Sequence, residues 1–160
     1  QGQVQVVPLH MALIASAVAN GGTMMTPHVV ESTRTSTGAV ISTTNPTPWK
    51  VAMATTTADT LRQLMIGVVQ SGTASCCMQL ANGVVAAAKT GTAQLNPEGQ
   101  KQRSHAWITA FAPAGQGETP RVAVAVMLKG VNDTISAGTG GHLAGPIAKK
   151  MLDKALTVIP

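Results

Sequence analysis

The stretch Val84–Gln94 limits the fold more than any other part of this sequence. It runs Val-Val-Ala-Ala-Ala-Lys-Thr-Gly-Thr-Ala-Gln, so small apolar residues lead directly into a cation, two hydroxyls and a glycine. The small side chains predict a strand against which another layer packs closely. At the polar end Lys89 supplies a point charge, Thr90 and Thr92 supply hydroxyl donors, and Gly91 lets a ligand approach the backbone. We therefore expect an open strand that binds an anionic, extended, peptide-like partner by strand addition.

The size and composition are those of one ordinary folded domain. The chain has 160 residues, of which 44% are hydrophobic and only 11% charged, so disorder is excluded as its main state. The net charge of +5 is spread along the chain, and the aromatic residues are only Trp49, Trp107 and Phe111. Nucleic acid is therefore not expected as a partner. No apolar run approaches the roughly 18 residues that cross a bilayer.

The order of the expected elements favours an α+β fold, with helices packed on an antiparallel sheet. Helical patterns come first, and three strand patterns joined by short loops and a closing helix follow. The first helix is apolar nearly all round, so we expect it to be buried on every side. The predicted helices are Pro8–Asn20, Ala58–Gln70 with Thr57 as its cap, and Leu143–Leu156 with Pro146 in its first turn. The predicted strands are Val84–Gln94, His105–Pro113 and Arg121–Leu128.

Two further segments are predicted as surface structure. Strands His28–Val30 and Ala39–Ile41 flank Thr37-Gly38 and indicate a hairpin. The prolines of Asn45–Pro48 predict a linker, and Gly138–Gly141 is expected to be a flexible loop.

The cysteines and histidines predict neither a structural cross-link nor a metal site. Cys76 and Cys77 are adjacent, so a bond between them closes no useful loop, and we expect two half-buried thiols. The four histidines lack the spacing and carboxylate partners of a metal site, and we expect structural or surface roles for them. They are His10, His28, His105 and His142.

Two motifs compete at Lys89-Thr90. A phosphate-binding loop needs a second glycine where Ala88 stands, and it needs a glycine-rich loop in place of a strand. The alternative is the Lys-Thr-Gly element of serine acyl-transferases of the penicillin-recognising class. In that chemistry a cation and hydroxyls hold a substrate carboxylate, and a backbone N–H beyond the glycine helps to hold the developing oxyanion. The strand context favours this second interpretation.

Five blocks in order resemble the C-terminal half of a class B penicillin-binding protein transpeptidase domain. The blocks are Gly2-Gln3 with Val6–Ala12, Ala19–Gly22 and Pro27; Gly67–Val69 with Gly72–Ala74; Ala88–Gln94; Ala106-Trp107 with Phe111–Pro113; and Pro146–Ala148. The resemblance implies the fold of the transpeptidases and serine β-lactamases, with residues 1–160 as the C-terminal part of one domain. Val7, His10 and Ala110 stand where the family more often has Thr, Gln and Gly, which we interpret as packing changes.

The nucleophile of that family is missing from this sequence. No Ser-x-x-Lys and no Ser-x-Asn occurs, and Thr47-Pro48-Trp49-Lys50 has the wrong nucleophile in a linker. In the family both motifs precede everything seen here. We therefore expect the N-terminal half of the same domain to supply them and this chain alone to be inactive.

The resemblance also implies a role for each matching residue. Lys89 and Thr90 would be catalytic; Thr90, Gly91 and Thr92 would bind substrate; and the Thr92 N–H would share the oxyanion hole. The implied function is a peptidoglycan D,D-transpeptidase that acts through a serine acyl-enzyme on stem peptides ending in D-Ala-D-Ala and that binds β-lactams, without a cofactor or metal. The implied location is the extracytoplasmic face of the bacterial membrane, with the anchor outside this chain. The alternatives are a non-catalytic sensor or scaffold that binds the same ligands, and a D,D-carboxypeptidase or β-lactamase.

Overall fold

The computed structural model describes residues 4–97 and 99–159. Gly2 and Gln3, which contribute to the resemblance, lie outside the described residues. The first half of the chain contains α1 (Pro8–Ala19), β1 (Thr23–Met25), β2 (Ser32–Arg34), β3 (Val40–Thr43), β4 (Pro48–Val51) and α2 (Thr55–Gln70). The second half contains the short helix η1 (Ala81–Gly83), β5 (Ala87–Gln94), β6 (Ser104–Ala112), β7 (Val122–Leu128), α3 (Asp133–Ala137) and α4 (Gly140–Val158).

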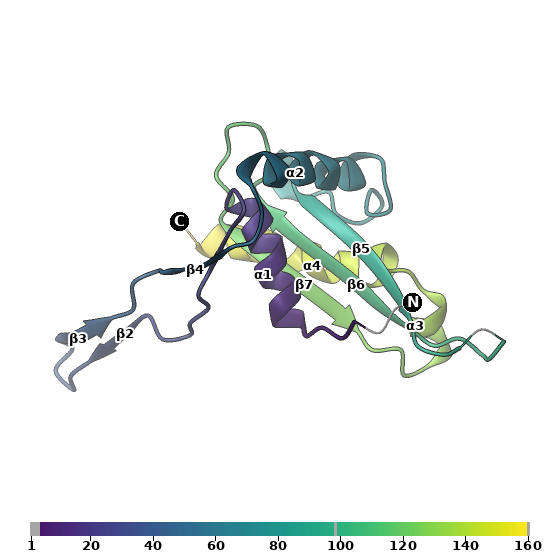
Figure 1. The fold of residues 1–160 in the computed structure, drawn as a ribbon, viewed down its shortest axis with the longest axis horizontal. Coiled ribbons are helices and arrows are strands. Elements are labelled where there is room, and N and C mark those ends of the chain that lie inside the picture. The colour runs from purple at the N-terminus through teal and green to yellow at the C-terminus, as the bar shows by residue number, and fades with distance from the viewer. Residues whose placement is uncertain (1–3, 98, 160) are drawn as a thin grey trace.

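The predicted antiparallel sheet is confirmed, in the strand order β5-β6-β7. The middle strand β6 is largely buried because it is paired on both sides and covered on both faces. Figure 1 shows α1 crossing one face of the sheet, α4 lying behind it, and α2 running across one end. This layering confirms the α+β class.

The alanines of β5 explain how both layers approach the same strand. Successive strand residues point to opposite faces. Ala88 accordingly belongs to the core cluster that includes Met78, Ile108 and Leu152, whereas Ala87 belongs to the cluster around Phe111 and Met65. Both alanines are fully buried. Larger side chains here would push the covering helices off the strand that carries Lys89.

The first helix differs from the prediction, because only one side of it is covered. Ala15, Ala17 and Val18 are buried, whereas Leu9 is 59% exposed. The buried side packs on β6, β7 and α2, and within the described residues nothing covers the outer side. The expectation of burial on every side was wrong for this part of the chain.

Three other boundaries also differ. The prediction of a loop at Gly138–Gly141 was wrong for Gly140 and Gly141, because α4 begins at Gly140. As a result, Pro146 lies beyond the first turn of α4 and not within it, as the sequence had predicted. Helix α2 begins at Thr55 with Ala54 as the N-cap residue, so Thr57 is not its cap. Lastly, the segment expected to be a linker ends in β4, which pairs with β1 through Met24↔Lys50, and Pro48 occupies the first strand position, where a missing N–H is tolerated.

The surface hairpin is confirmed, with different residues in its first strand. Ser32↔Thr43 and Thr33↔Ser42 pair, so the strand lies beyond His28–Val30. Figure 1 shows this hairpin projecting away from the sheet.

The expectation of two thiols was wrong as well. Cys76 and Cys77 form a disulfide bond with each other.

Candidate active site

Strand β5 forms the outer edge of the three-stranded sheet within the described residues, with its polar half beside an open groove. It pairs on one side with β6 through Lys89↔Thr109 and Gly91↔Trp107. A groove of about 300 Å³ follows this half of the strand. It is lined by Val6, Met11, Lys89, Thr90, Gly91, Thr92, Ala93, Trp107 and Thr109. The four predicted site residues therefore lie together, as expected from their spacing.

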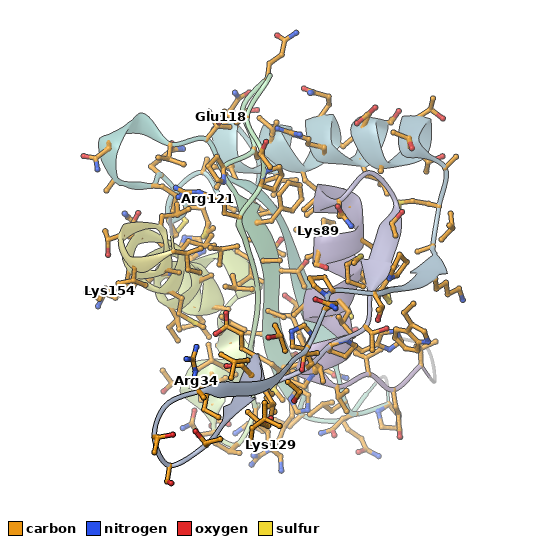
Figure 2. The ribbon with its side chains drawn as sticks, turned by 90° about the vertical axis from the view of Figure 1, so that its left-hand side faces the viewer. Arg34, Lys89, Glu118, Arg121, Lys129 and Lys154 are labelled. Atoms are coloured by element: carbon orange, nitrogen blue, oxygen red, sulfur yellow. A yellow bond between two sulfur atoms is a disulfide. The ribbon has the colours of Figure 1, made fainter. Side chains whose placement is uncertain are left out.

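Lys89 lies in the open rather than in packed hydrocarbon. Its side chain is exposed, and Nζ donates a hydrogen bond of 2.7 Å to the Thr90 carbonyl oxygen. Figure 2 shows Lys89 on the side of the sheet that carries α1, away from Lys154 on α4. The ammonium can therefore meet an anion that enters the groove.

Thr90 has a hydroxyl partner that the sequence did not single out as a site residue. Its Oγ1 lies 2.6 Å from Thr73 Oγ1, in the turn that follows α2. A hydroxyl has one donor proton and two acceptor lone pairs. If Thr73 donates to Thr90, the Thr90 proton remains available to a ligand carboxylate. The one signal for Thr73 was its place in the Gly72–Ala74 block.

The first turn of α4 supports the backbone of β5 from the opposite side of the sheet. A Cβ on Gly140 would lie 2.6 Å from the Gly91 oxygen and 2.1 Å from the Trp107 oxygen. Only a residue without a side chain permits this approach. Helix α4 is capped here by Thr139, whose side chain accepts from His142 N.

Gly91 and Trp107 are paired across the two strands, and both line the groove. A Cβ on Gly91 would lie 3.4 Å from Trp107 Cβ, so a side chain there would fill space that the glycine leaves open. Trp107 is half-buried and also lines the groove. Thr92 is exposed along the same wall.

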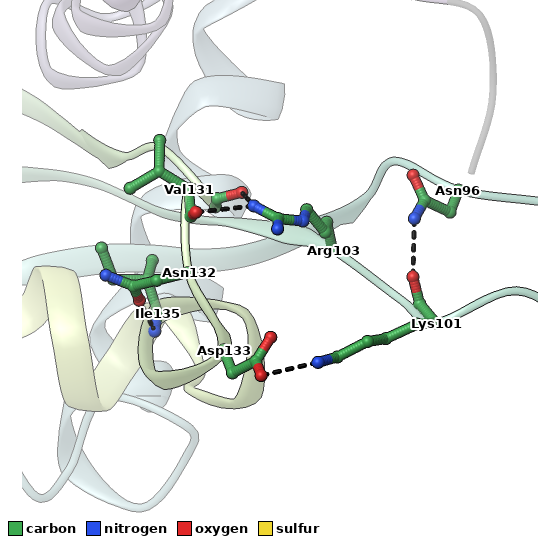
Figure 3. A network of polar contacts seen from close by, with 8 residues as sticks. Asn96, Lys101, Arg103, Val131, Asn132, Asp133 and Ile135 are labelled. Atoms are coloured by element: carbon green, nitrogen blue, oxygen red, sulfur yellow. Dashed lines mark hydrogen bonds and ion pairs between the residues drawn. The ribbon is translucent and has the colours of Figure 1, made fainter.

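A polar network fixes the loops beyond the end of β5. Lys101 Nζ lies 2.6 Å from Asp133 Oδ2, and Arg103 donates to the Val131 oxygen at 2.6 Å (Figure 3). The Lys101 hydrogen bond and charge hold the pKa of Asp133 below its usual range. These contacts join the β5–β6 loop to the segment that leads into α3, although Lys101 and Asp133 are too exposed to contribute much stability.

Residues 4–97 and 99–159 do not gather three or more potential metal-ligating side chains at one place. Of the histidines, His105 Nδ1 accepts from Gly130 N at 3.0 Å, and His142 lies 3.0 Å from Thr139 Oγ1. None of the helices in the same part of the chain is long and apolar enough to cross a membrane.

Comparison with known proteins places this arrangement in context. The family model described as the penicillin binding protein transpeptidase domain matches residues 1–153. The chain is 39% identical to the peptidoglycan D,D-transpeptidase PbpA of Mycolicibacterium smegmatis, covering 98% of this chain and 30% of that protein. It is 30% identical to the peptidoglycan D,D-transpeptidase MrdA of Acinetobacter baumannii, covering 96% of this chain and 23% of that protein.

The solved structures agree. A ceftriaxone acyl-enzyme complex of penicillin-binding protein A from Mycobacterium tuberculosis is 37% identical, with a TM-score of 0.83 over 98% of this chain and 34% of that one. The chain therefore spans about a third of the length of the relatives that it matches.

Proposed function

The chain belongs to the class B penicillin-binding protein transpeptidase family, and we propose that it forms one wall of a peptidoglycan D,D-transpeptidase site in the intact protein. The observation that carries the proposal is the groove beside β5, along which Lys89, Thr90, Gly91 and Thr92 lie together on an outer strand. An extended peptide can pair with such a strand, and its carboxylate then meets the ammonium and the hydroxyls.

In this proposal the serine nucleophile comes from the N-terminal half of the same domain. Its oxygen attacks the carbonyl of the D-Ala-D-Ala bond, and the Thr92 N–H helps to hold the oxyanion. The bond to the terminal D-alanine breaks, and that residue leaves with a proton on its nitrogen. An amine of a second stem peptide then attacks the acyl-enzyme, which forms the cross-link and frees the serine. Lys89 stabilises negative charge in the site and assists the proton transfers.

An apolar surface on this chain supports a partner half. Leu9, Leu13, Pro27 and Trp49 are among the residues that line a second groove of about 500 Å³, and Trp49 is 59% exposed. Apolar side chains gathered in this way usually mark an interface. We assign this groove to contact with the rest of the transpeptidase domain, and we place the intact protein on the extracytoplasmic face, anchored by a segment outside this chain.

The relatives support β-lactams as ligands of the same site. The solved structures of penicillin-binding protein A include acyl-enzyme complexes with ceftriaxone, imipenem and penicillin G. A β-lactam carries a carboxylate beside its reactive amide, so it would occupy the wall formed by Thr90 and Thr92.

Labelling with a fluorescent penicillin tests the proposal. We expect the intact protein to be labelled and the 160-residue chain alone to remain unlabelled. Lys89→Ala in the intact protein should lower the acylation rate at least about 100-fold, the order seen when one charge-stabilising group is removed from an acyl-transfer site. Lys101→Ala, which removes another exposed lysine, is the matched control and should leave the rate unchanged.

Two outcomes would count against the proposal. Labelling of the isolated chain would reveal a nucleophile within these residues. Equal rates for Lys89→Ala and Lys101→Ala would remove Lys89 from the site.

A further inference from the structure

The bond between Cys76 and Cys77 has no role in stability that the fold explains. A disulfide stabilises a protein mainly by excluding conformations of the unfolded chain, and the effect grows with the length of the loop it closes. These two residues are neighbours in the chain. The bond therefore excludes almost nothing from the unfolded state, and its consequences lie in the local structure of the turn.

The position of the disulfide makes it accessible to an external thiol. Cys76 is exposed, whereas Cys77 is half-buried. A Cβ on Gly145 would lie 3.0 Å from Cys77 Cβ, so Cys77 packs against α4. Exposed disulfides are the ones that exchange readily with thiols in solution. The geometry favours attack on the Cys76 sulfur, with Cys77 as the leaving thiolate.

The same turn carries the partner of Thr90. It is tightly wound, because Ser75 N donates to Gly72 O and Cys77 N donates to Ala74 O, each at 3.1 Å. Thr73 lies within it and hydrogen-bonds to Thr90 at 2.6 Å. The disulfide closes a small ring that restricts the backbone at Cys76 and Cys77. Thr73, which makes the contact with Thr90, lies in the same turn.

Helix α4 lies along both ends of this turn. A Cβ on Gly141 would lie 2.0 Å from the Thr73 oxygen, and Gly145, one helical turn later, meets Cys77. The turn therefore contacts α4 at Thr73 and Cys77, and β5 at Thr90. A change in the backbone at Cys77 can pass to Thr73 through Ala74, which neighbours Thr73 and whose carbonyl oxygen accepts from Cys77 N.

We propose that Cys76–Cys77 is a thiol–disulfide exchange site for dithiols, coupled to Thr90 through Thr73. One thiolate of the dithiol attacks the Cys76 sulfur, the S–S bond breaks, and Cys77 leaves as a thiolate that takes up a proton. The second thiol of the reagent then attacks the mixed disulfide and releases Cys76. The protein disulfide is reduced to two thiols, and the dithiol is oxidised to its cyclic disulfide. Reduction loosens the turn and weakens the Thr73–Thr90 hydrogen bond. The effect on acylation rests on the proposed function, but the exchange itself does not.

The test uses the intact protein and two independent readouts. The first is peptide-resolved mass spectrometry after alkylation with iodoacetamide, with and without prior treatment with dithiothreitol. We expect no alkylation of Cys76 and Cys77 before reduction and complete alkylation of both afterwards. The second is the rate of acylation by fluorescent penicillin after the reagent has been removed. We expect this rate to fall about fivefold on reduction, the size of one neutral hydrogen bond, and to return on reoxidation.

Two variants test whether the change in acylation rate arises at Cys76 and Cys77 and whether it passes through Thr73. The double variant Cys76→Ser/Cys77→Ser should acylate at one rate whether or not it meets dithiothreitol, which excludes effects at cysteines elsewhere in the protein. Thr73→Val should still exchange at the cysteines but lose most of the redox effect on acylation.

Alkylation of both cysteines without reductant would overturn the proposal, as would an unchanged acylation rate after complete reduction. Absence of labelling in both redox states would instead refute the proposed function, and with it the coupling to Thr90. The alkylation data would then decide the exchange site by themselves.

Discussion

The contact between Thr73 and Thr90 determines what Thr90 can offer a ligand. The two hydroxyl oxygens are 2.6 Å apart, and Thr90 lines the groove. If Thr73 is the donor, the contact fixes the Thr90 side chain and leaves the Thr90 proton available to a ligand. If Thr90 binds the ligand, as we propose, Thr73 is a positioning residue that acts on the ligand through Thr90.

Substitutions of Thr73 should therefore change the acylation rate in a specific pattern. Thr73→Val keeps the shape but removes the hydroxyl, and we expect acylation of the intact protein by penicillin to slow about fivefold. Thr73→Ser keeps the hydroxyl and should restore most of the rate. The second-order acylation rate constants of the three proteins provide the measurement, and equal losses for Val and Ser would show that Thr73 only fills space.

A second prediction at the residue scale concerns the effect of substituting Gly140 on stability. A Cβ there would collide with the carbonyl oxygens of Trp107 and Gly91, both part of the paired strands. Gly140→Ala should lower the free energy of unfolding of the intact protein by about 2 kcal/mol or more, because neither β5 nor α4 can move without opening the core. The matched control is Gly67→Ala in α2, where nothing lies within 4 Å, and it should stabilise by about 0.5–1 kcal/mol. Urea unfolding of both variants measures the difference, and similar effects would contradict the close approach.

The sequence predicted Lys89, Thr90, Gly91 and Thr92 as one group because consecutive residues of an edge strand lie together, whichever residues of the next strand they pair with. It could not single out Thr73 for a site role, because its contact with Thr90 depends on how the turn after α2 lies against β5. The disulfide was missed because adjacency in sequence carries no information about pairing.

Among the elements, α4 is the one that ties the second half of the chain together. It packs on all three strands of the sheet, and Asp153 links it to η1. Asp153 Oδ1 accepts from Ala81 N at 2.8 Å, and Oδ2 lies 2.5 Å from Lys149 Nζ. Burial raises the pKa of Asp153, but the hydrogen bonds from Lys149 and Ala81 and the charge of Lys149 outweigh it, so the pKa lies below its usual value.

This link predicts a pH-dependent contribution to stability. A carboxyl whose pKa is lower in the folded state stabilises that state above its unfolded pKa of about 3.9, and the contribution is lost as the pH falls through the folded value. Asp153→Asn should lower the free energy of unfolding by about 1 kcal/mol at pH 7, and the difference from the parent should shrink below about pH 4.

Asp133→Asn is the control for that experiment. Asp133 has an ion pair of 2.6 Å, but both members of the pair are exposed, so we expect a loss well below that of Asp153→Asn at pH 7. Denaturant unfolding at several pH values compares the two, and a loss for Asp153→Asn that persists at low pH would contradict the linkage.

The sheet was predictable because its strands are rich in small and apolar residues, Ala and Val above all, and are consecutive in the sequence. The start of α4 was not, because two glycines disfavour a helix locally. The tertiary structure overrides that preference, since only glycine fits against the backbones of Gly91 and Thr73. Strands β1 and β4 were missed because the β2–β3 hairpin lies between them in the sequence, so no tight turn marks them as a pair.

At the scale of the whole molecule, the main feature to explain is one side of α1, where apolar side chains are not covered by any other described residue. Val7, Leu9, Leu13 and Trp49 line a groove of about 500 Å³, and Val7, Leu9 and Trp49 are more than half exposed. The transpeptidase relatives are about three times as long as this chain. We have assigned the groove to contact with the rest of the domain.

A pair of substitutions distinguishes an interface from ordinary exposure. In the intact protein, Leu9→Ser should lower the free energy of unfolding by about 2 kcal/mol, because the leucine would be buried by the partner half. Val29→Ser removes an apolar side chain that is fully exposed beside the hairpin and should have no effect. Thermal unfolding followed by circular dichroism compares them, and equal, negligible effects would leave the groove without a partner.

The α+β class followed from the order of the elements, whereas the expectation of a partner half came from the motifs that this sequence lacks, Ser-x-x-Lys and Ser-x-Asn. Neither observation could indicate which surface such a half would cover, because that depends on which side of α1 packs on the sheet.

The central claim is that β5 binds the carboxylate of an acylating ligand, and a crystal structure of the intact protein acylated by penicillin tests it most directly. The ligand carboxylate should lie about 2.6–3.0 Å from the hydroxyl oxygens of Thr90 and Thr92, with Lys89 Nζ nearby. A carboxylate bound elsewhere, with the groove along β5 empty, would contradict the account.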